Sequence, residues 1–305
     1  MNLAPILIFA YNRPDHLQQT LEALSLNADA KHSNLYIFCD GAKPNMQELD
    51  LKKIESVQFI AKNENRFKSV VVKIRKSNYG LAQSIILGVT EVINKHGRII
   101  VLEDDIVSGK FFLKFMNDAL NVYEGSEKVY GISGHRYDFI KYVDSETYFL
   151  PISCSWSFAT WKDKWEKINF NTYELYDTIK RNNYEKKLNY GNLDFFQMLT
   201  EQKNGNINSW AIRYYTSMFI QKGYYIYPKL PLIKNIGFDG SGVHCLSDTK
   251  SANKKNSLEN KRIIVSKQFP KTKKVIKLQS VFAKLILKLK IVKKVKSRII
   301  KKNDE

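Results

Sequence analysis

The sequence has few cysteines, and their spacing forms no recognisable pattern. Its 305 residues include three of them, Cys39, Cys154 and Cys245, which are odd in number and far apart. Because no CxxC pair is present, neither a disulfide framework nor a cysteine-based zinc site is predicted. So few unpaired cysteines are typical of a protein from a reducing compartment.

Several other signals are also missing. No stretch of about 18 uncharged apolar residues occurs, so no transmembrane helix is expected. Neither GxGxxG nor GxxxxGK[ST] is present, which argues against a Rossmann dinucleotide motif and against a P-loop. The opening stretch "MNLAPILIFAYNRPDHL" has a short apolar run without a basic flank. We therefore expect a first strand there rather than a signal peptide.

Positive charge, in contrast, is abundant and concentrated at the C-terminal end. Of the formal net charge of +19, residues 271–305 supply +11, from 13 Lys and Arg against two acidic residues. Apolar residues recur there at helical spacing: Leu278, Phe282, Leu285, Leu289 and Val292. We expect a basic amphipathic helical tail that lies on an anionic membrane surface. A solvated or disordered basic tail is the alternative; the continuous aliphatic stripe argues against nucleic acid.

Hydrophobic residues make up 44% of the chain, enough for a sizeable core. Strand and helix patterns alternate up to residue 105. The expected strands cover 5–11, 35–40, 69–75 and 98–105, and the expected helices 13–26, 46–61 and 80–97. This order predicts an α/β fold whose mostly parallel sheet is flanked by helices. Ligands of such folds bind at the carboxyl ends of the strands.

The pattern is less regular after residue 105. We expect helices over 109–124, 155–168 and 192–205, strands over 128–136 and 147–152, a long aromatic helix running into a strand over 207–228, and a glycine-rich loop over 232–245. A polar linker follows at about 246–257. The predicted organisation is a nucleotide and metal half over 1–125, an acceptor half with a closing loop over 126–246, and a linker with the basic tail over 247–305.

Three consecutive acids, Glu103, Asp104 and Asp105, follow the expected fourth strand. A solvated loop or a helix N-cap would explain them without a ligand. A divalent cation is the functional alternative, because Mg²⁺ and Mn²⁺ prefer carboxylate oxygens and often bridge them to substrate phosphates. The position at the predicted ligand edge of the sheet favours the cation, which would also relieve the repulsion among the carboxylates.

The stretch "VLEDDIVSGKFFLKFMNDAL" resembles the DxD-type motif of GT-A glycosyltransferases, both the bacterial family-2 type and the Golgi N-acetylglucosaminyltransferase that starts complex N-glycans. Other blocks match in order over about residues 3–245: "ILIFAYNRPDHLQQTLEAL", "IFCDGAK", "NYGLAQSIILGV", "SCSWSFATW", "SWAIRYY" and "NIGFDGSGVH". The resemblance implies a GT-A type sheet and transfer of a hexose or N-acetylhexosamine, with inversion, from a nucleotide-diphosphate sugar to a glycan or lipid-linked glycan.

The resemblance also implies a cofactor, a setting and roles for the acids. Mn²⁺ or Mg²⁺ would be bound by Asp105, with Asp104 on the ribose and Glu103 on the nucleotide or a metal-bound water. The setting would be cell-surface polysaccharide biosynthesis. Since the N-terminal anchor of the Golgi enzyme is not found, we expect a cytoplasmic bacterial-type enzyme, peripherally associated with the inner face of the plasma membrane.

Further residues receive roles by the same resemblance. Arg13 would contact the diphosphate or the nucleotide base, and Asp40 would accept a hydrogen bond from the imide N–H of that base. Arg213 would hold a phosphate or orient the catalytic base. Their structural alternatives are a surface arginine, a turn residue and a surface ion pair. Ser155 and Trp156 would form a wall of the sugar and acceptor pocket.

Two further assignments concern other aromatic residues and the glycine-rich loop. We expect Trp161 and Trp165 to be core residues. His244, at the end of the glycine-rich loop, would touch metal or phosphate, although a lone histidine is more often structural.

The catalytic base is the point at which the sequence departs from the family pattern. Related bacterial proteins usually have Asp where this chain has Asn208, and an amide cannot take a proton. Either Asp194 or Asp239 substitutes, or the protein is impaired. A non-catalytic membrane-surface binding protein on a decayed transferase fold is therefore the alternative function. A nucleotidyltransferase is a second one, although its early glycine-rich signature with a lysine is not found.

Overall fold

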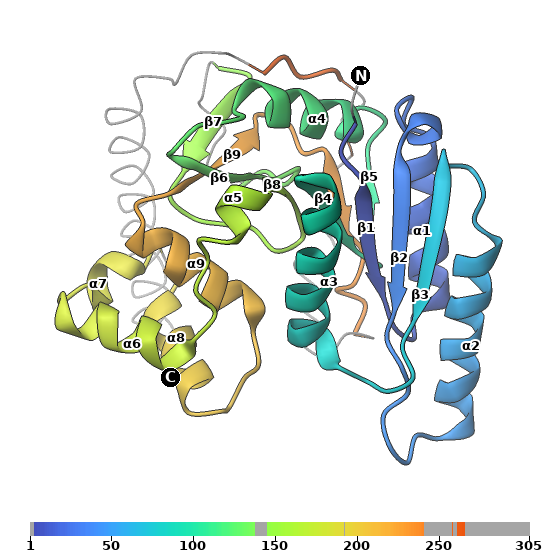
Figure 1. Cartoon of the computed structure of the whole chain (residues 1–305), viewed down its shortest axis with the longest axis horizontal. Helices are drawn as coiled ribbons and strands as arrows, with labels where there is room; N and C mark the ends of the chain where they lie inside the picture. Colours follow the sequence, from blue (N-terminus) through green and yellow to red (C-terminus); the bar gives the residue numbers. More distant parts are fainter. Residues whose placement is uncertain (1–2, 138–144, 192, 241–257, 259–260, 266–305) are drawn as a thin grey trace, which may run out of the picture.

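The computed structural model describes residues 3–137, 145–191, 193–240, 258 and 261–265. These residues form a central sheet with helices on both faces (Figure 1). The sheet strands are β1 (Ile6–Ala10), β2 (Asn34–Cys39), β3 (Ser69–Ile74), β4 (Arg98–Glu103), β6 (Val129–Ile132), β7 (Thr147–Leu150), β8 (Ser157–Trp161) and β9 (Tyr224–Pro228). Their order across the sheet is β3-β2-β1-β4-β8-β6-β9-β7. The predicted α/β fold class is thus confirmed.

The first half of the chain folds as its alternating pattern predicts. Strand β1 pairs in parallel with β2 and β4, and β2 pairs in parallel with β3. The connections are α1 (Pro14–Ser25), α2 (Glu48–Asn63) and α3 (Gly80–His96). Gly97 ends α3 in a left-handed conformation with a φ of 75°, which glycine adopts without a steric penalty.

Side chains that alternate along β1 point into two separate cores. Ile6 and Ile8 face one core with α1, α2 and α4 (Phe112–Val122), whereas Leu7 and Phe9 face the other core with α3 and α9 (Trp210–Ile220). Every residue of β1 is buried. Because each large apolar side chain stabilises the fold by about 1.5–3 kcal/mol when it is fully buried, β1 and β4 are held rigidly at the centre of the sheet.

The helix predicted over residues 155–168 is wrong. Residues 157–161 form β8, which pairs antiparallel with β4 and β6, and only Lys162–Trp165 form a short helix, α5. All five residues of β8 are buried between neighbouring strands. A short, fully buried apolar run cannot be assigned to helix or strand by its period alone. The sheet is therefore mixed, and Trp161 and Trp165 are core residues, as predicted.

A group of helices lies at the opposite end of the molecule from β3 (Figure 1). It consists of α6 (Thr172–Arg181), α7 (Glu185–Leu188), α8 (Phe195–Lys203) and α9. Helix α8 and the aromatic helix that continues into β9 were predicted from the sequence, whereas α6 and α7 were not. Asn171 caps α6, since its side chain accepts hydrogen bonds from the backbone N–H groups of Tyr173 and Glu174.

A second, two-stranded sheet joins distant parts of the chain. Strand β5 (Ile106–Ser108) pairs antiparallel with β10 (Ile233–Asn235), and Asn235 lies opposite Ile106. The sequence predicted only a glycine-rich loop over 232–245, so strand β10 is a correction. As a result of this pairing, the residues after β10 emerge beside the acids that follow β4.

Some predictions concern residues outside the described part of the chain. They include His244, the polar linker at about 246–257, and the basic tail over 271–305. Among the residues that are described, no helix has the length and apolar character needed to span a bilayer. The division at residue 125 stays a prediction, and the sheet itself runs through both proposed halves because β4 pairs with β8.

Candidate functional site

The three acids lie at the carboxyl end of β4, where the sequence analysis placed them. Glu103 is the last residue of β4 and pairs with Phe9 of the parallel strand β1. Asp104 and Asp105 are almost fully buried, with 3% and 6% of their surfaces exposed. Because β1 and β4 run in parallel, the residues that follow β1 reach the same edge of the sheet.

Arg13 is the residue after β1 that meets these acids. Its Nη2 pairs with Asp104, and its Nη1 lies 3.0 Å from Oδ2 of Asp105. The arginine immediately precedes Pro14 at the start of α1, so its backbone is fixed by the helix start. One guanidinium thus pairs with two of the three carboxyl groups.

The electrostatics of the cluster favour proton retention. Burial, reinforced by the neighbouring Asp105 and Asp104, raises the pKa of Glu103 to about 8. Burial also raises the pKa of Asp104 to about 6, although the Arg13 charge opposes this shift. The ligand-free cluster therefore holds at least one proton near neutral pH, and additional positive charge at this place would release it.

One oxygen of the cluster lacks a hydrogen-bond partner. Oδ1 of Asp105 is buried and accepts no hydrogen bond, an arrangement that is costly for a polar atom. Within the described ranges, no group of three or more His, Cys, Asp and Glu side chains could enclose a metal ion. A divalent cation bound here would rest on one or two carboxylates and complete its coordination with substrate oxygens and water, which is typical of Mg²⁺.

The segment after β10 covers this cluster. The Ile236 N–H donates to the Asp105 carbonyl at 2.9 Å, and the Gly237 N–H donates to Oδ1 of Asn235 at 2.7 Å. A Cβ atom on Gly237 would lie 2.1 Å from Oδ2 of Asp105 and 3.0 Å from Nη1 of Arg13. Glycine is therefore the residue that lets the backbone approach the carboxylate this closely.

Asp239 connects the far end of this segment to α1. Its Oδ2 lies 3.2 Å from Nε2 of His16, in the first turn of α1. The sequence analysis proposed Asp239 as a candidate base but did not single out His16. His16 follows Arg13 by three residues, and residues at this spacing lie on the same side of a helix start. This spacing could have indicated that His16 lies near the site.

Trp156 forms a wall next to the acids. Since Leu102 pairs with Ser157 in the antiparallel ladder between β4 and β8, Trp156 and Ser155 continue the chain past the end of β4. The Trp156 ring contacts Phe238, at a centroid distance of 5.6 Å, and His135, at 4.6 Å. His135 is thus a second histidine of the site that the sequence analysis left without a role.

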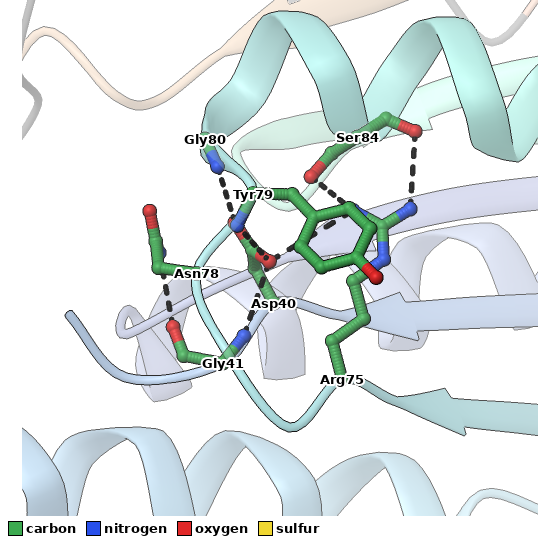
Figure 2. A network of polar contacts seen from close by, with 7 residues as sticks. All are labelled: Asp40, Gly41, Arg75, Asn78, Tyr79, Gly80 and Ser84. Carbon is green, nitrogen blue, oxygen red and sulfur yellow. Dashed lines mark hydrogen bonds and ion pairs between the residues drawn. The ribbon is translucent and has the colours of Figure 1, made fainter.

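Asp40, at the end of β2, lies at the start of α3 (Figure 2). Its buried carboxylate accepts hydrogen bonds from the backbone N–H groups of Gly41, Tyr79 and Gly80 at 2.9–3.1 Å. It therefore satisfies the N-terminus of α3. Its proposed contact with a nucleotide base stays a prediction, and in this state both oxygens already have backbone partners.

Arg75 supports the same turn. Its guanidinium lies 3.8 Å from Oδ1 of Asp40, hydrogen-bonds to Ser84 and stacks on the Tyr79 ring at 4.4 Å (Figure 2). The Tyr79 ring itself is 46% exposed. The end of β2 and the start of α3 are thus connected by side chains from three different segments.

The other predicted site residues make their contacts within the helical group. Asp194 is exposed and caps α8, accepting a hydrogen bond from the Gln197 N–H at 3.0 Å. Asn208 Oδ1 accepts from Nη2 of Arg213 at 3.2 Å, and burial lowers the pKa of Arg213. The structure thus joins Arg13, the three acids, Trp156 and Asp239, whereas Asp194, Asn208 and Arg213 belong to a different part of the fold.

Comparisons with known proteins give only distant likenesses. No protein-family model matches the sequence, and no curated protein matches it. The chain is similar to the mannosyltransferase PcManGT from Pyrobaculum calidifontis, solved in complex with GDP-Man and Mn²⁺, with a TM-score of 0.36 and 9% identity, covering 53% of this chain and 48% of that one. The chain thus spans about half the length of that protein.

Two further solved structures match over more of this chain. An active-site mutant of LgtC matches with a TM-score of 0.40 and 9% identity, over 73% of this chain and 72% of that one. S. aureus TarS matches with a TM-score of 0.34 and 12% identity, over 74% and 36%. The likenesses concern the fold alone.

Proposed function

We propose that this protein is a metal-dependent glycosyltransferase that moves a sugar from a nucleotide-diphosphate sugar to a glycan or glycolipid acceptor. The observation that carries this proposal is the buried carboxylate cluster at the end of β4. There, Oδ1 of Asp105 has no partner, and Arg13 offers a guanidinium at the same place. The cluster lies at the sheet edge where α/β proteins bind their ligands.

The residues of the cluster fit a cation shared with a diphosphate. Asp105 would bind Mn²⁺ or Mg²⁺ through its unpaired oxygen, with Asp104 beside it. Such a cation, when bound, supplies Lewis-acid neutralisation of the charge that develops on the leaving nucleoside diphosphate. Arg13 suits the same leaving group, because a planar guanidinium can hold two phosphate oxygens with parallel hydrogen bonds.

The aromatic wall supports a sugar as the transferred group. Trp156 and Phe238 contact each other beside the carboxylates, and Trp156 is half-buried. Aromatic faces of this kind bind the apolar faces of sugar rings, and the nearby Ser155 hydroxyl would hydrogen-bond to a sugar hydroxyl. A donor whose diphosphate lies at Arg13 and Asp105 would place its sugar towards this wall.

Inversion is part of the proposal and requires a base near the acceptor hydroxyl. Asp194 and Asn208 lie in the helical group, and Asp239 is held by His16 on the side of α1, next to Arg13. That location favours a role for Asp239 in holding the segment above the diphosphate rather than in proton transfer. The anomeric configuration of the product, followed by NMR, tests inversion directly.

Thermal denaturation with a panel of donors tests the main proposal. UDP-, GDP- and CMP-sugars are added with and without Mn²⁺, because a ligand that binds the native state raises the apparent stability by mass action. For one nucleotide class, we expect the rise in melting temperature with nucleotide and Mn²⁺ together to exceed the sum of the rises that each produces alone. Asp105→Asn should abolish this synergy, whereas Asp118→Asn, on the outer side of α4, should keep it.

Hydrolysis of the same nucleotide sugars separates an enzyme from a binding protein. Slow, Mn²⁺-dependent release of the nucleotide (the nucleoside diphosphate from UDP- and GDP-sugars, CMP from CMP-sugars) by the wild type, and not by Asp105→Asn, supports a transferase. Synergistic binding without turnover for any acceptor would favour the binding-protein alternative. Additive effects of Mn²⁺ and every nucleotide would contradict the proposed site itself.

The acceptor and the cellular location rest on the basic tail. We propose that residues 271–305 bind an anionic membrane surface, where a lipid-linked acceptor would be available, because the sequence combines an apolar stripe with 13 Lys and Arg. Cosedimentation with vesicles that contain anionic lipid tests this. Removal of residues 271–305 should abolish binding, and undiminished binding of the shortened chain would contradict the proposal.

A further inference from the structure

The contact between His16 and Asp239 joins two segments that are remote in the sequence. Nε2 of His16 lies 3.2 Å from Oδ2 of Asp239. The histidine side chain is 13% exposed and is fixed in the first turn of α1, whereas the aspartate side chain is 47% exposed. A largely buried side chain on a helix thus meets a more exposed side chain on a loop.

Among the described residues, three contacts attach the segment that bears Asp239 to the rest of the protein. At its start, the Ile236 N–H is bonded to the carbonyl of Asp105, next to the β5–β10 pair. In its middle, Phe238 contacts the Trp156 ring. At its end, Asp239 meets His16. Between the first and last attachments, Gly237 lies directly against Asp105 and Arg13, so the segment crosses the cluster from β5 to α1.

This contact contributes little to the global free energy of unfolding, because a pair with a half-exposed partner is well solvated. Its effect is instead local. Residues 237–239 have no strand or helix of their own, so their position depends on Phe238 and Asp239. A residue that fixes one of these two attachments therefore affects the fraction of molecules in which the segment lies over the carboxylates.

We propose that His16 is a positioning residue: through Asp239 it holds residues 237–239 over the carboxylates, so that the donor pocket is partly formed before the donor binds. This inference rests on the proposed function. A segment that is already ordered costs less free energy to fix when a ligand binds. Loss of the contact should therefore weaken donor binding and leave the chemical step in the bound complex largely unchanged.

Amide hydrogen exchange of the ligand-free protein tests the positioning without any donor. In His16→Ala and Asp239→Ala, exchange of a peptide covering residues 233–240 should be about three- to fivefold faster, the factor expected for one exposed pair. His16→Gln, which keeps an N–H donor near the place of Nε2, should exchange like the wild type. Lys180→Ala, which removes another exposed pair, with Glu185, is the matched control and should leave this peptide unchanged.

Steady-state kinetics test the functional part with the donor identified by the thermal panel. His16→Ala should raise KM for the donor about three- to fivefold and change kcat less than about twofold, and His16→Gln should restore KM. The double variant His16→Ala/Asp239→Ala should be no worse than the more affected single variant, because both changes remove the same interaction. An additive double variant would show that the two residues act separately.

The outcomes distinguish this inference from the proposed function. Unchanged exchange in His16→Ala would overturn the inference whether or not a donor is found. Faster exchange together with an unchanged KM, or a fall in kcat alone, would overturn it as well. If the wild type binds no nucleotide with Mn²⁺, the proposed function fails, and the exchange measurement still decides whether His16 holds the segment.

Discussion

In the ligand-free protein, Nη1 of Arg13 lies 3.0 Å from Oδ2 of Asp105. The second nitrogen of the same guanidinium pairs with Asp104, so one side chain compensates two buried carboxylates. Arg13 comes from the start of α1, and the acids come from the end of β4. The guanidinium thus stabilises the edge of the sheet at which the proposed substrate would bind.

Replacement of Arg13 should destabilise the protein. Arg13→Gln leaves two buried carboxylates without their cation, and the expected loss is about 3 kcal/mol in the free energy of unfolding at pH 7.5, measured by urea denaturation. Arg13→Lys keeps the charge but not the two parallel contacts, so its loss should be smaller. Equal stability of Arg13→Gln and the wild type would show that the carboxylates are protonated or solvated without Arg13.

The stability of the ligand-free protein should fall as the pH rises from about 4 to about 8. Glu103 and Asp104 have pKa values of about 8 and about 6 in the folded protein, above their usual values of 4.5 and 3.8. The folded state therefore binds more protons than the unfolded chain within this window, and folding loses free energy as these protons are released. Below about pH 3 both groups are protonated in both states, and they have no further effect.

Glu103→Gln tests this assignment. An amide removes the charge that would otherwise have to be buried, so the variant should be more stable than the wild type at pH 8, by on the order of 2 kcal/mol, and nearly equal to it at pH 4. Urea denaturation at both pH values measures the difference. A stabilisation that is the same at pH 4 and pH 8 would contradict titration of Glu103 as the cause.

Gly237→Ala should disturb the cluster by direct contact. The new methyl group would lie 2.1 Å from Oδ2 of Asp105, and overpacking of this kind costs about 1–3 kcal/mol. In an Asp105→Ala background the same change should cost clearly less, because the obstructing carboxylate is gone. The four proteins of this cycle can be compared by urea denaturation. Equal costs in both backgrounds would show that the strain lies elsewhere.

Asp40→Ala should loosen the start of α3. The carboxylate accepts backbone hydrogen bonds from Tyr79 and Gly80 (Figure 2), and loss of a cap with buried donors costs about 1–2 kcal/mol. Arg75 would also lose its neighbouring charge. Amide exchange of residues 78–82 should accelerate, whereas Asp50→Ala, in the first turn of α2, should not affect it. Unchanged exchange in Asp40→Ala would contradict a capping role.

Much of the fold was predictable where the pattern is local. Up to Glu103, apolar residues recur with the period of a strand or of a helix, and each run is long enough to tell the two apart. Residues 157–161 were assigned wrongly because burial on both faces removes the period of a strand. Helix α6 was not predicted, because only Leu175 and Ile179 of its residues are buried and two apolar residues make too short a helical pattern.

The candidate site was predictable where it depends on strand ends. Parallel strands bring Arg13 and the acids to one edge, which follows from the chain order alone. The roles of His16 and Gly237 depend on the three-residue strands β5 and β10, whose pairing is decided by tertiary contacts. No local pattern marks such short strands, and so the contacts that they create were not foreseen.

The pairing of β5 with β10 brings the segment that covers the carboxylates to the end of β4. The contacts of residues 236–239 are with Asp105, Trp156 and His16, which lie outside helices α6, α7 and α8. Insertions or exchanges between α6 and α8 could therefore reshape the surface available to an acceptor while the cluster keeps its arrangement. The architecture thus separates a constant end, which holds the carboxylates, from an adaptable end formed by these helices.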